Sequence, residues 1–223
     1  MAHDWLALLR ESTDRFASTV AGADPGARVT WCPDWSLRDL VDHLGGVHQW
    51  AAHAVVDGNP DFDPEPVPHD ADLAGWYRRH ASALLEVLSQ TPPDAPAWTL
   101  DKADRTAGFW RRRQVHETVM HTWDAEEALG PPSPIDASLA WDGVREVADV
   151  MYPRQVRLGR VDPLLSSLQL VATDVGDSVI IGSGEPVVVR DRAEVLLRLL
   201  WHRAPLDDLD PRAAGLLSRP IAP

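Results

Sequence analysis

Apolar residues recur at helical spacing through the first part of this chain, and this periodicity constrains its fold more than any other feature. Four segments, 3–21, 36–54, 70–89 and 108–129, carry apolar side chains every three to four residues. Proline- or glycine-containing stretches follow them and act as helix stops. A fifth helix is expected over residues 137–158, interrupted near Pro153. The pattern predicts an N-terminal bundle of helices.

The periodicity changes after Pro163. Short β-branched runs cover residues 168–173, 178–181 and 186–189, and turn-forming stretches with Gly and Asp separate them. An apolar segment, 192–202, then has the spacing of a helix. Helices followed by strands predict an α+β protein with two domains, a helical bundle over 1–158 and a small α/β domain over 164–223. In the second domain we expect a short antiparallel sheet covered by one helix.

Composition narrows the classes of partner. The 223 residues include 34 acidic and 21 basic side chains, a formal net charge of −13, which argues against binding to nucleic acids or anionic membranes. A single cysteine, Cys32, excludes an intramolecular disulfide. The N-terminal segment has no continuous apolar stretch typical of a signal peptide, and no run is long enough to span a membrane. We expect a cytoplasmic protein, monomeric or homodimeric.

The fourth predicted helix carries a polar stripe where an apolar face would otherwise pack. At about 100° per residue, His121 lies roughly 40° from Glu117, and Asp124 lies roughly 20° to its other side. A Glu–His pair at this spacing can chelate one metal ion if another element supplies a further ligand. The alternative is an ordinary contact between two side chains on the surface of a helix.

The second predicted helix offers that further ligand. His43 lies roughly 60° from Leu40 and 40° from Val47, at the edge of the apolar stripe, so it points toward the bundle. An inward histidine can equally be a core residue with satisfied hydrogen bonds. On the fourth helix Arg113 lies roughly 40° from Glu117, where it can pair with Asp124 or an anionic substrate, or belong to a solvated basic face.

Two motifs resemble the mycothiol-dependent maleylpyruvate isomerase family, whose N-terminal domain is a DinB-like metal-binding four-helix bundle. They are Trp35-Ser-Leu-Arg-Asp-Leu-Val-Asp-His43-Leu44 and Arg113-Gln-Val-His-Glu117-Thr-Val-Met-His121-Thr-Trp-Asp124, and the segment ending at Arg203 resembles the family's C-terminal helix. The resemblance implies zinc held by His43, Glu117 and His121, a mycothiol-like thiol as co-substrate, and an active-site arginine, best matched by Arg203. At His202 the family more often has a small residue.

Two functional hypotheses follow. The first is a zinc-dependent enzyme that activates a low-molecular-weight thiol for isomerisation of, or S-transfer to, a small electrophilic, anionic substrate. In it Asp124 orients His121 or a bound water, and Arg203 or Arg113 holds a substrate carboxylate. The second is a non-catalytic, metal-stabilised module that binds a ligand or a partner, since no acid or base residue can be assigned beyond the proposed ligands.

Overall fold

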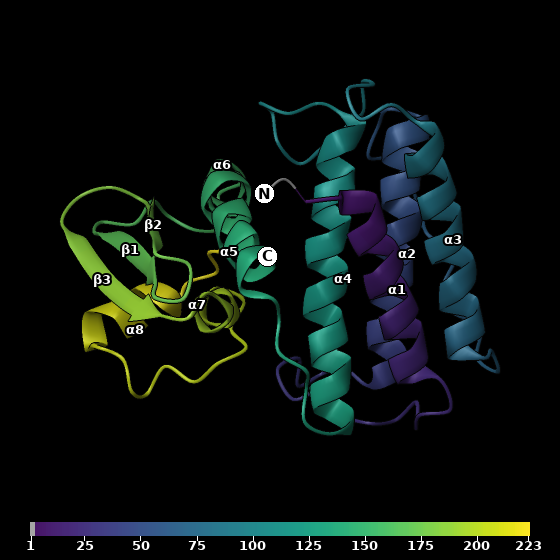
Figure 1. Ribbon diagram of the computed structural model, residues 1–223, viewed down its shortest axis with the longest axis horizontal. Coiled ribbons are helices and arrows are strands. Elements are labelled where there is room, and N and C mark those ends of the chain that lie inside the picture. The colour runs from purple at the N-terminus through teal and green to yellow at the C-terminus, as the bar shows by residue number, and fades with distance from the viewer. Residues whose placement is uncertain (1–2) are drawn as a thin grey trace. The chain divides into compact units, whose positions relative to one another are not determined.

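The chain folds into two compact units, and the division between them falls after Ser133. The structure, a computed structural model, describes residues 3–223 (Figure 1). None of the helices in this range is long and apolar enough to cross a membrane. The first unit consists of four long helices: α1 (Trp5–Val20), α2 (Leu37–Val56), α3 (Leu73–Gln90) and α4 (Ala107–Leu129). The predicted bundle is confirmed, and each helix lies within a few residues of its predicted range.

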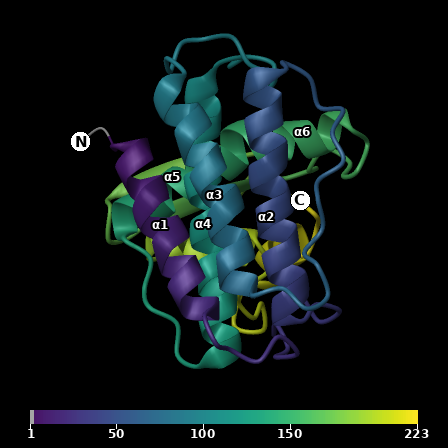
Figure 2. The ribbon, with the colours of Figure 1, turned by 90° about the vertical axis from the view of Figure 1, so that its right-hand side faces the viewer.

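In the bundle α4 packs against α1 and α2, and α3 packs against α1 and α2 on the other side (Figure 2). The helices α2 and α4 run antiparallel. Side chains later in α2 therefore contact side chains earlier in α4, in the pairs His43–Glu117, His48–Gln114 and Trp50–Trp110. This direction brings one turn of α2 opposite the polar stripe of α4.

The start of α2 is fixed by a capping box. The Ser36 hydroxyl accepts a hydrogen bond from the Asp39 amide at 3.3 Å, and the Asp39 carboxylate accepts one from the Ser36 amide at 2.8 Å. The Ser36 hydroxyl also donates to the Asp39 carboxylate at 2.6 Å, and this bond, together with the one from the Ser36 amide, lowers the pKa of Asp39. Further along α2, Gly45 lies under the ring of Trp76, where an added Cβ would come within 2.1 Å of a ring carbon. Both features set the position of α2, on which His43 lies.

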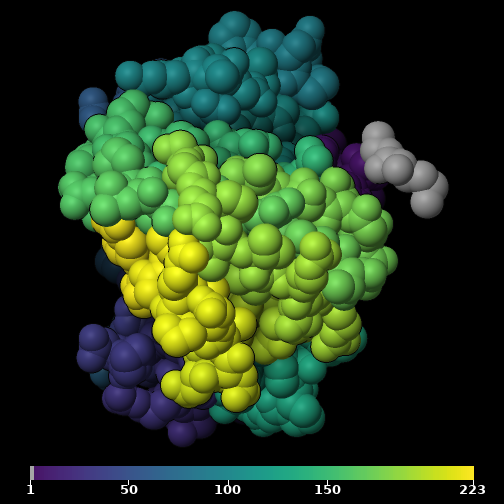
Figure 3. Space-filling model, turned by 90° about the vertical axis from the view of Figure 1, so that its left-hand side faces the viewer, coloured from purple at the N-terminus to yellow at the C-terminus, as the bar shows by residue number. Residues whose placement is uncertain are grey.

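The second unit begins with a long helical segment. It contains α5 (Ala137–Glu146), the π-helical turn η1 (Val147–Met151) and α6 (Tyr152–Arg157). The interruption predicted near Pro153 takes this form. Proline has no amide hydrogen, and its ring crowds the carbonyl four residues earlier, so the wider π turn just before Pro153 lets the helix continue without a break. The end of the chain returns to this helical segment: the Gln155 side chain, on α6, donates to the carbonyl of Ala222, and the last residues (yellow) lie beside the segment (Figure 3).

The sheet of the second unit is mixed, and the prediction of an antiparallel sheet is wrong for one pair. The strands are β1 (Ser167–Ala172), β2 (Asp177–Ile181) and β3 (Pro186–Asp191), in the order β2-β1-β3. β1 pairs antiparallel with β2 and parallel with β3. The turn after β2 crosses the start of β1: the Ser167 amide donates to the Glu185 carbonyl and the Ser167 hydroxyl to that of Gly184. Gly184 has φ +93°, and an added Cβ would lie 2.8 Å from the Leu165 carbonyl oxygen.

Helix α7 (Ala193–Leu200) matches the predicted covering helix and packs against β1 and β3. A short further helix, α8 (Pro211–Leu217), lay outside the sequence predictions. The contacts also divide the chain earlier than the predicted boundary between residues 158 and 164, so α5 and α6 lie in the second unit. The physical reason is that α5 packs its apolar face on α7.

Candidate metal centre

Three side chains converge inside the first unit. His43 from α2 and Glu117 and His121 from α4 each present one ligand atom, and these atoms all lie within 4.8 Å of one another. Oε1 of Glu117 lies 3.2 Å from Nε2 of His43 and 3.4 Å from Nε2 of His121. The structure thus brings together the three residues that the sequence predicts as ligands. Two imidazole nitrogens and a carboxylate oxygen form a donor set suited to a divalent metal ion.

His121 is oriented by a second carboxylate. Its Nδ1 lies 3.0 Å from Oδ2 of Asp124, whose side chain is completely buried. Because a carboxylate only accepts, Nδ1 carries the hydrogen, and Nε2 is left with its lone pair toward Glu117 and His43. Metal-binding histidines are commonly held in this way. In the structure Asp124 thus contacts the side of the His121 ring that faces away from Glu117.

Glu117 is held by Arg113. Nη2 of Arg113 donates to Oε2 of Glu117, the oxygen that does not face the histidines. Both side chains are almost completely buried, with 5% of the Arg113 side chain and 9% of the Glu117 side chain exposed. The sequence predicts that Arg113 pairs with Asp124 or an anionic substrate, and the structure shows in addition its contact with Glu117. The spacing of four residues permits this pair, but it does not single out Glu117, because Asp124 lies on the same stripe.

The three candidate ligands differ in exposure. The His43 side chain is 35% exposed, whereas Glu117 and His121 are closed off. The indole of Trp35 lies against the two imidazoles, with its ring centroid 4.8 Å from that of His43 and 6.2 Å from that of His121. Trp35 comes from the aromatic connector before α2. Its contact with the site could not be found from periodicity, because the residue lies outside any helix.

A buried polar network lies beside the site. His48 is completely buried; its Nδ1 lies 2.7 Å from Oε1 of Gln114, and its Nε2 lies 2.9 Å from the Tyr77 hydroxyl. Burial lowers the pKa of His48 to about 4, so this ring is neutral at pH 7. A neutral ring donates through Nδ1 to Gln114 and accepts the Tyr77 hydrogen at Nε2. His48 therefore links α2, α3 and α4 and is not a fourth metal ligand.

Arg203 lies in the second unit, just after α7. It is 8% exposed; its Nη1 donates to the Trp201 carbonyl at 2.6 Å, and its amide donates to the Arg198 carbonyl. The preceding residue, His202, has φ +57°, a left-handed conformation that favours glycine. The His202 ring donates to the Leu217 carbonyl at 2.8 Å. This bond fixes the His202 ring against the end of α8.

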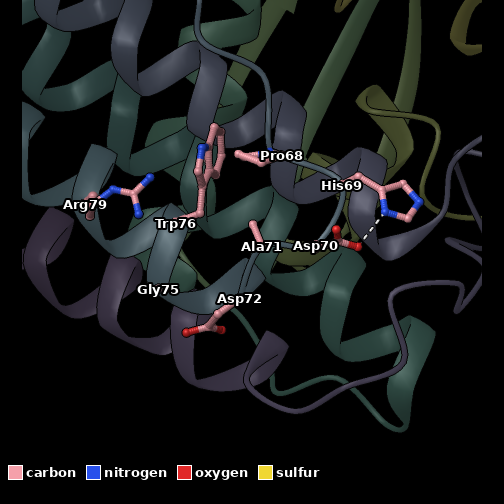
Figure 4. Close-up of a pocket in the computed structure, with 8 residues that line it drawn as sticks. All are labelled: Pro68, His69, Asp70, Ala71, Asp72, Gly75, Trp76 and Arg79. Atoms are coloured by element: carbon pink, nitrogen blue, oxygen red, sulfur yellow. Dashed lines mark hydrogen bonds and ion pairs between the residues drawn. The ribbon is translucent and has the colours of Figure 1, made fainter.

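A separate surface pocket of about 540 Å³ lies at the start of α3, within the first unit (Figure 4). Its lining combines acidic and basic side chains: Asp70, Asp72 and Arg79 lie around the buried ring of Trp76, and the ring of His69 turns toward Asp70. None of the three candidate ligands lines this pocket. Its mixed charge favours no single class of ligand, and we assign it no function.

Comparison with known proteins agrees with this architecture. The family described as mycothiol maleylpyruvate isomerase N-terminal domain matches residues 6–126, more than half of the chain. Uncharacterized proteins from two strains of Mycobacterium tuberculosis are 21% identical to it over 151 residues, which cover 65% of this chain and 78% of theirs.

Two solved structures have the same fold. They are crystal structures of the mycothiol-dependent maleylpyruvate isomerase and of a histidine-to-alanine mutant of it, 16% and 14% identical to this chain. Each superposes with a TM-score of 0.64 and covers 90% of this chain and 89% of its own. The matched region contains all three candidate ligands, and the chain belongs to the mycothiol maleylpyruvate isomerase family.

Proposed function

We propose that this protein is a zinc-dependent enzyme that uses a low-molecular-weight thiol, such as mycothiol, to isomerise a small electrophilic substrate or to transfer the sulfur to it. The observation that carries the proposal is the convergence of His43, Glu117 and His121 within 4.8 Å, each from the position that the family motif predicts. Membership of the family supports the thiol, and the solved structures of the same fold are those of a mycothiol-dependent maleylpyruvate isomerase.

The donor set suits a zinc ion. Catalytic zinc sites commonly have three protein ligands and keep a further position for water or substrate. A zinc ion held by these residues would supply a positive centre at which a thiol binds as thiolate near neutral pH. The chain's own residues would prepare this chemistry: Asp124 fixes the tautomer of His121, Arg113 holds Glu117, and the Glu117 and His121 side chains are almost completely buried.

The reaction requires no oxidant or reductant. The thiolate sulfur adds to one carbon of an electron-poor double bond, and the displaced electron pair moves onto the conjugated carbonyl group. The former double bond is now single and can rotate. Return of the electron pair expels the thiolate and restores the double bond in the other geometry, so the thiol is regenerated. If the carbon next to the carbonyl group takes up the proton released by the thiol, the sulfur stays attached and the product is a thioether. A thioether also forms when the sulfur displaces a leaving group from the carbon that it attacks.

For Arg203 and Asp124 we propose the roles that the sequence suggests. Arg203 would bind a carboxylate of the substrate, because a guanidinium matches a carboxylate with two parallel hydrogen bonds. Asp124 would act through His121, since its side chain is completely buried. Arg113 would hold Glu117, and its contact with an anionic substrate stays a prediction. The alternative function, a metal-stabilised binding module, has the same metal site but no turnover.

The test compares two variants. His121→Ala should lose both the metal and thiol-dependent turnover, because two ligands on separate helices chelate poorly. Arg203→Ala should keep the metal and lose turnover by about tenfold or more, through a raised KM for anionic substrates. His53→Ala, outside the site, and Arg212→Ala, on α8, are the matched controls.

Metal content and turnover of unsaturated carboxylates, maleylpyruvate among them, are measured with and without mycothiol. If the metal-loaded wild type turns over no acceptor with the thiol, the enzyme proposal is wrong and the binding module stands. If Arg203→Ala keeps full turnover, Arg203 does not belong to the site.

A further inference from the structure

The contact between Arg113 and Glu117 suggests a role beyond holding a side chain. Arg113 donates to Oε2 of Glu117, while Oε1 faces the two histidines. The carboxylate is thus divided, with one oxygen for the arginine and one for a metal ion. An arginine with 5% of its side chain exposed also places a full positive charge inside the bundle.

The charges of the three candidate ligands and of the two residues that contact them can be added up. Glu117 and Asp124 are each negative in their ionised forms, Arg113 is positive, and the ligand histidines are neutral when they bind a metal. A divalent ion then leaves one positive charge in excess, which one monoanionic ligand neutralises. Without Arg113 the centre would already be neutral, and the same anion would add a net negative charge. Because Asp124, Glu117 and Arg113 are all buried, solvent screens these charges poorly.

We propose that Arg113 is a positioning residue that makes the metal centre select an anionic ligand, a thiolate or a carboxylate, over a neutral one. It does so by occupying Oε2 of Glu117 and by cancelling the charge of this carboxylate. The inference rests on the proposed metal site and explains why this site would prefer an anionic ligand.

The test uses cobalt(II) in place of zinc, because its visible spectrum reports ligands that enter the site. Azide serves as the anionic probe and imidazole as the neutral one, each titrated into the cobalt-loaded protein. Arg113→Gln keeps a hydrogen-bond donor but removes the charge, and should weaken azide binding by about tenfold or more while imidazole binding changes little. Arg113→Lys keeps the charge and should keep the azide affinity close to that of wild type.

Arg112→Gln is the matched control, the same substitution at the next residue of α4, where the side chain is only partly buried. It should leave both affinities unchanged, since solvent screens a more exposed charge. A merely structural role for Arg113 predicts that azide and imidazole weaken together. Joint weakening of azide and imidazole in Arg113→Gln, or an azide affinity equal to that of wild type, would overturn the inference. Neither result would contradict the proposed metal site.

Two further results matter: failure of the wild type to bind cobalt, and failure of Arg113→Gln to fold. If the wild type takes up no cobalt, both the proposed function and this inference are overturned. If Arg113→Gln does not fold, Arg113→Lys decides: the ratio of its azide affinity to its imidazole affinity must equal that of wild type. A fall in this ratio would overturn the inference, because the charge is still present.

Discussion

Single residues in the centre of the bundle act in pairs across the helices. Glu117 has Arg113 on one oxygen and the two histidines on the other, and Asp124 fixes His121. None of these polar groups would be stable in the core alone, because an unpaired buried charge is costly. Together they form a connected set whose exposed side is at His43, the most exposed of the three candidate ligands.

His48 gives the bundle a measurable dependence on pH. Its pKa is about 4 in the folded protein, against an ordinary value of 6.5, because burial disfavours the charged ring. The unfolded chain binds the additional proton between these two values, so the stability from His48 is present above pH 6.5 and is lost as the pH falls toward 4. The shift corresponds to a loss on the order of 3 kcal/mol.

The measurement is the free energy of unfolding of the metal-free protein by denaturant titration between pH 4 and pH 7. His48→Gln keeps polar contacts in the core but does not titrate, so the difference between wild type and this variant isolates His48 from the titration of His43 and His121. That difference should shrink or reverse toward pH 4. A difference that stays constant over the range would show that His48 does not titrate as described.

The elements show what periodicity can and cannot predict. The apolar repeat predicted α1 to α4 because each of these helices buries one face in the core, and in α4 the polar stripe was visible as a break in that repeat. The β-branched runs predicted three strands. The order and direction of these strands in the sheet could not be predicted. The sequence of a short turn does not show whether the next strand returns beside β2 or crosses to the other edge of β1.

The candidate site was predictable for a related reason. Glu117, His121 and Asp124 share one helical stripe, so local geometry places them together. His43 was predicted from its position at the edge of the apolar stripe of the second helix, and the family motif agrees with it. The contacts of Trp35 and the pairing of Arg113 with Glu117 depend on how side chains pack in three dimensions. The sequence narrowed Arg113 to the inward stripe, but it left open which acidic group the arginine would meet.

At the scale of the whole molecule, the boundary between the units can be tested by limited proteolysis. Residues 130–136 connect α4 to α5, contain three prolines and are mostly exposed. Exposed linkers are cut before packed elements, so a first cut in this segment is expected from the contacts within the chain. The segment 158–164, the boundary proposed from the sequence, should be cut later. The fragments are identified by mass spectrometry, and a first cut within 158–164 would support the boundary predicted from the sequence and contradict the division after Ser133.

The central claim is that His43, Glu117 and His121 hold one divalent metal ion, and uptake of zinc by the metal-free protein tests it most directly. The protein is stripped with a chelator, zinc is titrated in, and the bound ion is counted by elemental analysis. We expect one zinc ion per chain for the wild type and for His53→Ala, and no stoichiometric uptake for His43→Ala or His121→Ala. Wild-type protein that binds no zinc, or His121→Ala that binds one ion as tightly as the wild type, would contradict the claim.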